Sequence, residues 1–364
     1  MKIAILSCNT GGGHNTAAAA VSEVLAQRGH SCYICNALNF MPKTTAQVIS
    51  KGHNFAYRHT PKLFGIGYRF EEKYQPSLFT DQAIKGALPL YEELRRQKVD
   101  AVLCVHLFPA MMMTELRRNH GVKLPTWFVA TDFTCYPGVS DLDVDGICIP
   151  HEELRKDFID AGIPSHLLHA TGIPVRQVFS RPMSRESARQ ALGIEGKNRV
   201  LLLACGSMGA GPVREVAHTI VNLLREDDLL ITICGSNQRL KQQMDTDFCH
   251  ATDRIQVLGF TKQMGLYIHA ADLLITKAGG LTTSEALAAQ VPLLYLDAVP
   301  GCETYNLDFM VRHGCALMSH DEKDVAPVLT GILSGAIDPQ TMVQRRTSFP
   351  VNSAESVCDL LCKE

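Results

Sequence analysis

Short apolar runs alternate with segments of helical periodicity along most of the chain. In the first half, strands are predicted over residues 2–8, 30–38, 100–106, 126–132 and 145–150, and a helix over residues 15–29 ends at Gly29. This alternation is typical of parallel sheets whose strands are joined by crossover helices. The pattern therefore predicts an α/β protein.

The same pattern starts again in the second half of the chain. Strands are predicted over residues 199–207, 229–236, 254–260, 271–280 and 292–301, with helices over residues 212–226 and 281–290. Residues 171–186 contain two prolines and no clear period, which indicates a linker. The sequence thus predicts two Rossmann-like domains, over residues 1–173 and 174–345, followed by residues 346–364, which end in a helix.

The composition is typical of a globular protein in which positive and negative residues are nearly balanced. The chain has 364 residues, of which 46% are hydrophobic and 20% charged, and its net charge of −2 argues against a nucleic-acid partner. No apolar run approaches the roughly 18–20 residues that cross a bilayer. The first residues lead from one Lys into a glycine turn, so no signal peptide is predicted and a cytoplasmic location is expected.

The thirteen cysteines are odd in number and scattered, and several lie within predicted strands. This distribution is typical of free thiols in a reducing compartment. Cys32 and Cys35 form a lone C-x-x-C in an extended stretch, where side chains three residues apart point to opposite faces. Cys358 and Cys362 are one helical turn apart but have no further ligand nearby in the sequence. No metal site is predicted from either pair.

A glycine-rich turn joins the first predicted strand to the first predicted helix. Gly12 and Gly13 lie in this turn, and His14 follows at the start of the helix. A neutral imidazole in such a turn can take a proton from an acceptor hydroxyl, or the ring can simply pack or cap the turn. The spacing is not G-x-G-x-x-G, and Asn36 stands where a dinucleotide-binding fold needs an acid. A dinucleotide site is therefore disfavoured.

Two glycine loops follow strands of the second domain. The first contains Gly206, Ser207 and Gly209, whose backbone amides can meet a phosphate or can form a plain tight turn. The second runs through Gly279, Gly280 and Leu281 into a helix predicted to start near Thr282. Because the N-terminus of a helix has orphan N–H groups, it is a good place for a diphosphate. This second loop is the more specific signal.

Glu285 has two interpretations of equal weight. In the first predicted turn of the helix, its carboxylate can accept hydrogen bonds from a ribose diol. Thr282 and Glu285 also have the spacing of a capping box, which stabilises a helix by roughly 1 kcal/mol and needs no ligand. A further loop after the strand at 292–301 brings Glu303 and Asn306 to the same sheet edge, where they can recognise sugar hydroxyls or cap a helix.

Two segments of the chain are rich in charged residues, one acidic and one basic. Asp141, Asp143 and Asp145 lack the glycine turn and closing glutamate of an EF-hand and are predicted to be a solvated loop. Residues 40–79 hold eight of the chain's 24 aromatic residues (14 Phe, 9 Tyr and 1 Trp in all) together with six Lys and Arg. Basic residues interleaved with aromatic ones favour an anionic membrane surface, the alternative being a helical excursion packed on the core.

Together these motifs resemble one family. GGGH at 11–14, TGIPV at 171–175, KAGG-L-T-x-S-E-A-L at 277–287 and P-G-x-E-x-x-N at 300–306 are similar to the monogalactosyldiacylglycerol synthase and processive diacylglycerol glucosyltransferase family. The second half also resembles the N-acetylglucosaminyltransferase of peptidoglycan lipid synthesis. The resemblance implies a GT-B glycosyltransferase, with two Rossmann-like domains facing across a cleft. It further implies an inverting enzyme without an obligatory metal or other cofactor, whose terminal helix returns to the first domain.

The resemblance also implies residue roles. His14 would be the general base, with Gly12, Gly13 and Asp132 on the acceptor side. The UDP-sugar would lie on the second domain. Phe260 would contact the uracil and Glu285 the ribose, while Glu303 and Asn306 would contact the sugar. The diphosphate would be bound by Gly279, Gly280, Thr282 and Thr283. Thr131 and Asp132 match the family's Thr-Asp motif, but Tyr136 and Val139 stand where many relatives carry His and Trp. The acceptor is therefore left open.

The expected activity is transfer of glucose or galactose from a UDP-hexose to diacylglycerol or another lipid acceptor. The protein is then expected on the cytoplasmic face of the cell membrane, bound peripherally to an anionic surface. Three rivals stay open: a UDP-GlcNAc transferase acting on an undecaprenyl-linked acceptor, a UDP-GlcNAc 2-epimerase of the same fold, and a non-catalytic nucleotide-sugar or lipid-binding protein. The sequence does not separate glucose from galactose, which differ at one hydroxyl.

Overall fold

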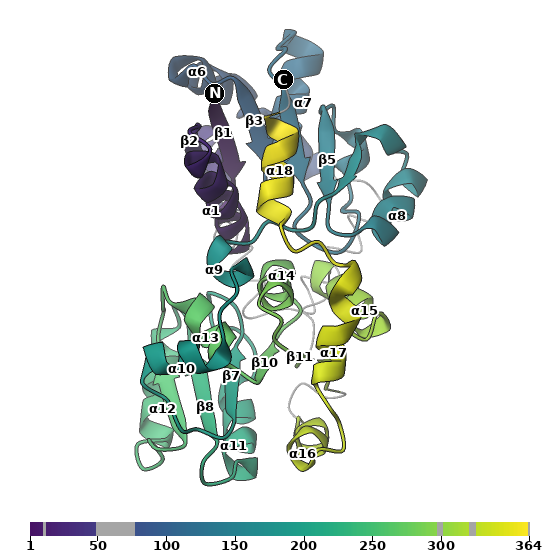
Figure 1. Cartoon of the computed structure of the whole chain (residues 1–364). Helices are drawn as coiled ribbons and strands as arrows, with labels where there is room; N and C mark the ends of the chain where they lie inside the picture. The colour runs from purple at the N-terminus through teal and green to yellow at the C-terminus, as the bar shows by residue number, and fades with distance from the viewer. Residues whose placement is uncertain (10–11, 49–76, 297–300, 320–324, 363–364) are drawn as a thin grey trace. The chain divides into compact units, whose positions relative to one another are not determined.

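The computed structural model describes residues 1–9, 12–48, 77–296, 301–319 and 325–362 (Figure 1). The chain forms two compact units. The first comprises Met1–Gln177, Pro300–Tyr305 and Pro350–Glu364, and the second comprises Val178–Val299 and Asn306–Phe349. The units divide after Gln177, whereas the sequence places the division after residue 173, and residues 300–305 return to the first unit earlier than the sequence suggests.

The first unit is built on a six-stranded parallel sheet with the order β2-β1-β3-β4-β5-β6. The strands are β1 (Lys2–Ser7), β2 (Ser31–Asn36), β3 (Ala101–Cys104), β4 (Thr126–Val129), β5 (Gly146–Ile149) and β6 (Leu168–Ala170). Strands β3 and β5 are buried along their whole length, whereas β2 is an edge strand on which Ile34 is 47% exposed. The sheet is therefore doubly wound, with its buried strands in the middle.

Helices join these strands and cover the sheet (Figure 1). The α-helices are α1 (Gly12–Gln27), α2 (Lys43–Gln47), α5 (Ser77–Ile84), α6 (Ala87–Gln97), α7 (Leu107–His120), α8 (Arg155–Asp160) and α18 (Ser353–Leu361). The 3-10 helices are η1 (Ala37–Phe40), η3 (Val139–Asp141), η4 (Glu152–Leu154) and η5 (Ser165–Leu167). Helix α9 (Gln177–Ser180) lies where the two units divide.

Helix α1 begins three residues before the predicted start, so the glycines and His14 form its first turn. Its apolar face carries Ala17, Val21 and Val24, which are buried. The helix ends at Gln27, two residues before the predicted end at Gly29, whose φ of +79° is a left-handed value that glycine adopts without strain. The terminal helix α18 packs against α1, and an ion pair of 2.7 Å joins Arg28 to Asp359.

The second unit repeats the architecture with a sheet of order β12-β11-β10-β7-β8-β9, again parallel. Its strands are β7 (Val200–Ala204), β8 (Leu229–Ile233), β9 (Ile255–Leu258), β10 (Leu273–Thr276), β11 (Leu293–Tyr295) and β12 (Leu317–Met318). Its helices are α10 (Arg185–Leu192), α11 (Val213–Leu223), α12 (Gln238–Asp247), α13 (Met264–Ala270), α14 (Gly280–Ala288), α16 (Ala326–Ser334), α17 (Gln340–Gln344) and the 3-10 helix η6 (Arg345–Ser348). Helix α15 (Cys302–Arg312) begins in residues assigned to the first unit.

Helix α11 shows why the second sheet is covered. Its buried residues Val213, Val216, Ala217 and Ile220 are spaced three or four apart, so they form one apolar stripe. This stripe packs on the core that lines β7 and β8. The predicted α/β class with two Rossmann-like domains is therefore confirmed.

The structure adds elements that the hydrophobic pattern does not show. Strands β6 and β12 have three and two residues, too few to produce a period. The predicted linker at 171–186 contains α9 and the start of α10, which Ser184 caps through the backbone N–H of Ser187. Short edge elements are thus held by their neighbours rather than by their own pattern.

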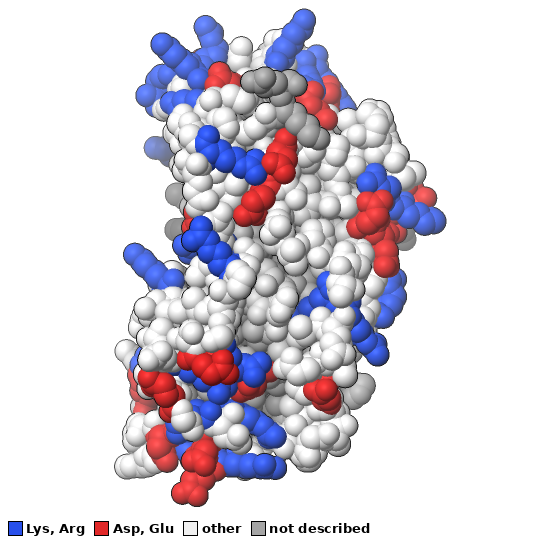
Figure 2. All heavy atoms as spheres, in the orientation of Figure 1, with Lys and Arg blue, Asp and Glu red and all other residues white. Residues whose placement is uncertain are grey.

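No helix within the described parts of the chain is long and apolar enough to cross a bilayer. Most of the aromatic and basic segment at 40–79 lies outside the described residues, so its predicted membrane contact has no structural counterpart here. Figure 2 shows acidic and basic side chains intermixed over the visible face, without a continuous field of one sign.

Candidate active site

In the first sheet, the strand order reverses between β1 and β3. The chain leaves β1 toward β2 on one side, and β3 to β6 follow on the other. In open α/β sheets, ligands bind beyond the carboxyl ends of the strands at such a reversal. Helix α1 begins just after β1, and α7 begins just after β3. Residues at these two helix starts therefore lie at the expected binding position of the first unit.

His14 is held at this position by two contacts. Its Nδ1 is 2.9 Å from the carbonyl oxygen of Val105, which follows β3, and 3.3 Å from Oγ1 of Thr131, which follows β4. Because a carbonyl oxygen can only accept, Nδ1 of the neutral ring must carry the hydrogen. The basic nitrogen of His14 is then Nε2, as a general base requires.

The other residues predicted for the acceptor side lie close in the fold. Gly12 and Gly13 form the first turn of α1 and are half-buried, and Gly12 accepts a hydrogen bond of 3.0 Å from Thr16. Asp132 is half-buried and directly follows Thr131, so the Thr-Asp motif lies beside His14 through its threonine. The structure therefore brings the first glycine turn and this motif together.

His106 is a residue of this site that the sequence analysis missed. It is the N-cap of α7, and its Nδ1 accepts a hydrogen bond of 3.1 Å from the backbone N–H of Phe108. Its ring centroid is 4.6 Å from that of His14, and the ring planes meet at 73°. The available signal was its position as the last residue of the strand predicted over 100–106. Its contact with His14 depends on the pairing of β1 with β3, which the local pattern does not reveal.

In the second sheet, the strand order reverses between β7 and β10. Thr276, at the end of β10, donates a hydrogen bond of 2.6 Å to the carbonyl of Ala204, at the end of β7. Gly206 has a φ of +70°, and a Cβ added there would lie 3.2 Å from Cε of Lys277. The two predicted glycine loops are therefore neighbours, with the Lys277 side chain lying against the first of them.

The loop after β7 is also tied to the loop after β8. The backbone N–H of Ser236 donates to the carbonyl of Ser207 at 2.9 Å. Gly209 is buried, and a Cβ there would lie 2.1 Å from the carbonyl oxygen of Cys234. Only glycine fits at such a distance, while the Ser207 side chain stays exposed. The loop is thus closely packed at Gly209 and exposed to solvent at Ser207.

Helix α14 begins in the second glycine loop. Gly279 is its N-cap in an extended conformation, no side chain caps the helix, and its first turn contains no acidic residue. The amides of Gly280, Leu281 and Thr282 precede the first intrahelical bond, which runs from Thr283 N–H to the carbonyl of Gly279 at 3.0 Å. Such a helix start suits a diphosphate.

The capping-box interpretation of Glu285 is wrong. Because the helix begins at Gly280, Thr282 is its third residue and not its N-cap, and Glu285 lies in the second turn. The helix therefore begins two residues before the predicted start at Thr282. Glu285 is buried, with 8% of its surface exposed. Its predicted contact with a ribose stays a prediction.

Two predicted contact residues support the loop instead of lining its surface. Thr283 is fully buried, and its Oγ1 lies 2.8 Å from the hydroxyl of Tyr295. Asn306 is also fully buried, and its Nδ2 donates to the carbonyl of Ala278 at 2.9 Å. Neither side chain has accessible surface for a ligand in this structure. Their contacts join α14 to β11 and α15 to the loop before α14, and their predicted ligand contacts stay predictions.

Two further predicted donor residues lie at other places. Phe260 follows the edge strand β9 and is 66% exposed, unusual for so large an apolar side chain. An exposed ring at the carboxyl end of a strand can stack on a base. Glu303 is half-buried in the first turn of α15. Their predicted contacts with uracil and sugar stay predictions.

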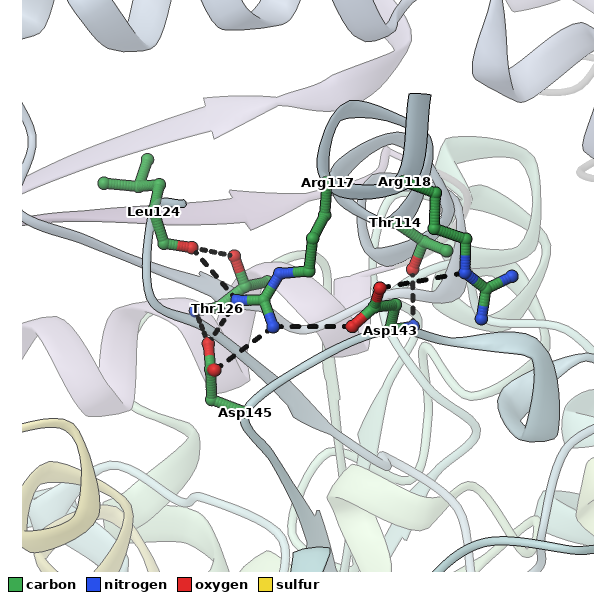
Figure 3. Close-up of polar contacts among 7 residues, drawn as sticks. All are labelled: Thr114, Arg117, Arg118, Leu124, Thr126, Asp143 and Asp145. Atoms are coloured by element: carbon green, nitrogen blue, oxygen red, sulfur yellow. Dashed lines mark hydrogen bonds and ion pairs between the residues drawn. The ribbon is translucent and has the colours of Figure 1, made fainter. Parts of the chain in front are cut away.

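The acidic run at 141–145 is more structured than the predicted solvated loop. Figure 3 shows Arg117 of α7 reaching both Asp143 and Asp145. Its two terminal nitrogens lie 2.5 and 3.1 Å from the carboxylate oxygens of Asp145, which also accepts from the backbone N–H of Thr126 at 2.7 Å. Partial burial raises the pKa of Asp145, but these hydrogen bonds outweigh it and lower the pKa overall. The run therefore anchors α7 to β4 and β5.

The cysteines are free thiols, as predicted. Burial raises the pKa of Cys35, Cys135 and Cys148 to about 12, so these thiols are protonated and unreactive at neutral pH. Within the part of the chain that the structure describes, no three His, Cys, Asp or Glu side chains are arranged to hold a metal ion.

Solved structures share this fold across the whole chain. MurG of Acinetobacter baumannii matches with a TM-score of 0.65 and 18% identity, covering 100% of this chain and 99% of that one. The S. aureus MnaA–UDP co-structure matches with a TM-score of 0.63 and 12% identity, covering 99% and 95%. At these identities the likeness concerns the fold, which is the GT-B arrangement of two Rossmann-like domains.

Relatives with similar sequences narrow the class of protein beyond the fold. A processive diacylglycerol beta-glucosyltransferase of Bacillus thuringiensis (strain Al Hakam) is 26% identical over 273 residues, which are 74% of this chain and 69% of the relative. One of Bacillus cereus (strain 03BB102) is 29% identical over 237 residues, which are 64% and 59% of the two chains. The aligned parts thus cover 69% of the first relative and 59% of the second, and the rest of each is unmatched.

Two family models divide the chain between them. Residues 14–175 match monogalactosyldiacylglycerol (MGDG) synthase, and residues 200–341 match the glycosyltransferase family 28 C-terminal domain. The chain is therefore a glycosyltransferase. Its first half matches the MGDG synthase family and its second half the family 28 C-terminal domain, which confirms the resemblance drawn from the motifs.

Proposed function

We propose that this protein transfers a hexose from a UDP-sugar to the hydroxyl of a membrane lipid, with diacylglycerol as the acceptor. The family models and the names of the two Bacillus relatives support a lipid acceptor. The UDP in the MnaA co-structure supports a UDP-linked donor for this fold. Glucose is the first donor to test because the relatives' names specify it, and galactose is the second because the MGDG synthase model names it.

The hydrogen bond from His14 to Val105 carries the mechanistic part of the proposal. It fixes the hydrogen on Nδ1, so Nε2 takes the proton from the acceptor hydroxyl as that oxygen attacks the anomeric carbon. Oγ1 of Thr131 also lies 3.3 Å from this Nδ1. A base with one fixed tautomer needs no rearrangement when the substrate arrives.

The donor diphosphate would lie on the N-terminus of α14. As the bond to the anomeric carbon breaks, UDP gains negative charge, which the amides of Gly280, Leu281 and Thr282 would stabilise. Glu285 would accept hydrogen bonds from the ribose, Phe260 would stack on the uracil, and Glu303 would contact the sugar. The backbone of Gly206, Ser207 and Gly209 would complete the pocket beside this helix start.

Direct attack by the lipid oxygen on an α-linked donor gives a β-linked product, so the reaction we propose is inverting. Fixed amides supply the leaving-group stabilisation, and we therefore expect no obligatory metal. The protein would act at the cytoplasmic face of the membrane, bound peripherally through the segment at 40–79, whose basic and aromatic residues suit an anionic surface.

The test is an incubation of the purified protein with UDP-glucose, UDP-galactose or UDP-GlcNAc and with diacylglycerol or an undecaprenyl-linked acceptor, read by mass spectrometry. We expect a hexosyl-diacylglycerol that is equally abundant with and without EDTA, and β-linked by NMR. A product on the undecaprenyl lipid alone would contradict the acceptor. Acceptor-independent epimerisation of UDP-GlcNAc would contradict transfer altogether, and loss of product with EDTA would contradict the metal-free mechanism.

A further inference from the structure

Two strands of the first sheet end in the same way. His106 follows β3 and His151 follows β5, and each is an extended N-cap residue. Their Nδ1 atoms accept hydrogen bonds from the backbone N–H groups two residues on, Phe108 at 3.1 Å and Glu153 at 3.2 Å. Because an N–H only donates, both Nδ1 atoms are unprotonated, so each of these rings has the tautomer opposite to that of His14.

The two capping histidines differ in one respect. The ring of His106 lies edge-on to the ring of His14, with a centroid distance of 4.6 Å and an angle of 73° between planes. The ring of His106 also contacts that of Phe108, with a centroid distance of 4.8 Å. His106 therefore combines a cap with a contact to the base.

The His14 ring needs such a contact to keep one orientation. Its hydrogen bonds to Val105 and Thr131 both involve Nδ1, on one edge of the ring. Rotation about the bond from Cβ to the ring costs little by itself, since this kind of torsion is broad. The ring of His106 lies edge-on to it with a centroid distance of 4.6 Å, so it restricts that rotation by direct packing.

We propose that His106 is a positioning residue for His14, and that its ring keeps Nε2 of His14 unprotonated and directed at the acceptor hydroxyl. The cap to Phe108 fixes the His106 ring, and this ring fixes the base. The catalytic consequence rests on the proposed function, but the tautomer of His14 does not. The two can therefore be measured separately.

The experiment compares His106→Asn with His106→Ala. Asparagine is a good N-cap residue, so His106→Asn keeps a hydrogen bond to the start of α7 and removes only the imidazole. His151→Asn is the matched control, because it changes the same kind of cap at the end of β5. Nitrogen-15 NMR of the histidine side chains reports the tautomer directly, and His14→Ala identifies the signals of His14.

In the wild type and in His151→Asn, we expect His14 with its hydrogen on Nδ1. In His106→Asn, we expect a mixture of both tautomers, a melting temperature close to wild type, and kcat lower by roughly tenfold with unchanged UDP affinity. His106→Ala should show the same tautomer mixture with a lower melting temperature, because the cap is lost as well.

Two results would overturn the proposal. One is a His14 tautomer that stays on Nδ1 in both His106 variants. The other is a fall in kcat without any change in that tautomer, because the effect would then not pass through His14. Absence of glycosyltransfer in the wild type, with the expected tautomers present, would refute the proposed function and leave the structural role of His106 standing.

Discussion

In both sheets, candidate site residues lie at the strand ends where the strand order reverses. The kinds of residue at this position differ between the two sheets. At the reversal between β1 and β3, the first unit places polar side chains, namely His14, His106 and Thr131. At the reversal between β7 and β10, the second unit places glycines, an uncapped helix start and the side chain of Lys277. The same scaffold thus presents imidazoles in one half and backbone amides in the other.

This difference teaches how one fold serves two partial tasks. An acceptor hydroxyl must lose a proton, which requires a side chain with a suitable basic atom. A leaving diphosphate only needs fixed hydrogen-bond donors, which backbone amides provide without titrating. Changes in the first unit should therefore reduce turnover, whereas changes in the second should reduce donor affinity.

The largest effect is expected from His14→Ala. Removing the general base should lower kcat by roughly 10²–10⁴ and leave UDP affinity near wild type, because the base does not touch the donor. Steady-state kinetics and UDP calorimetry measure the two quantities, with His166→Ala, at an exposed histidine of the same unit, as the control. Wild-type turnover in His14→Ala would remove this residue from the mechanism.

Glu285→Ala tests the second unit. Loss of hydrogen bonds between a carboxylate and the ribose should weaken UDP binding by roughly 10- to 100-fold. The accompanying fall in melting temperature should be small in comparison. The control is Glu215→Ala, at an exposed glutamate in the first turn of α11. A large fall in melting temperature with unchanged UDP affinity would make Glu285 a structural residue.

Membrane binding should depend on basic residues of the first unit's sequence. Changing Lys51, Arg58, Lys62 and Arg69 together to Gln should weaken binding to anionic vesicles by roughly tenfold or more, and the wild-type binding should fall as salt is added. Sedimentation with anionic vesicles measures this, and vesicles of neutral lipid are the control. Equal sedimentation of both proteins would contradict the membrane role of this segment.

The smallest effect is expected from Asp247→Asn, a change in the scaffold of the second unit. Hydrogen bonds from Arg214 first and His218 second lower the pKa of Asp247 to about 2. The ordinary value is about 3.9, so this carboxylate adds stability above about pH 4 and loses it as the pH falls toward 2. Because Arg214 is 43% exposed, solvent screens the pair and the effect is small.

Thermal unfolding of Asp247→Asn should show a melting temperature lower by roughly 1–3 °C at pH 7 and equal to wild type near pH 2. UDP affinity should not change. A variant that loses UDP binding would show that this ion pair supports the donor site and is not part of the scaffold alone.

Regular elements were predictable from the sequence where the chain carries its own signal. The turn that follows α1 is indicated by Gly29, and all strands of the two sheets except β6 and β12 follow from their apolar runs. The start of α14 was not predictable, because Thr282 and Glu285 have the same spacing whether the helix begins before or after Thr282. Only the conformation of the two preceding glycines decides between the cases.

The candidate site was predictable in its positions but not in its contacts. Glycine turns and the Thr-Asp motif point to the correct strand ends. The contact of His106 with His14 requires β1 and β3 to be neighbours, and the ion pair of Arg117 with Asp145 joins residues 28 apart in sequence. Such contacts follow from non-local strand pairing, which the local pattern does not contain.

The proposed division of roles gives proton transfer to the first unit and donor binding to the second. Its central claim is that the donor diphosphate binds at the second unit. Calorimetric titration of the folded protein with UDP and with uridine tests this directly, because the two ligands differ only in the diphosphate. We predict that UDP binds at least tenfold more tightly than uridine, through the amides at the start of α14. Equal affinities, or no heat with UDP, would contradict the account.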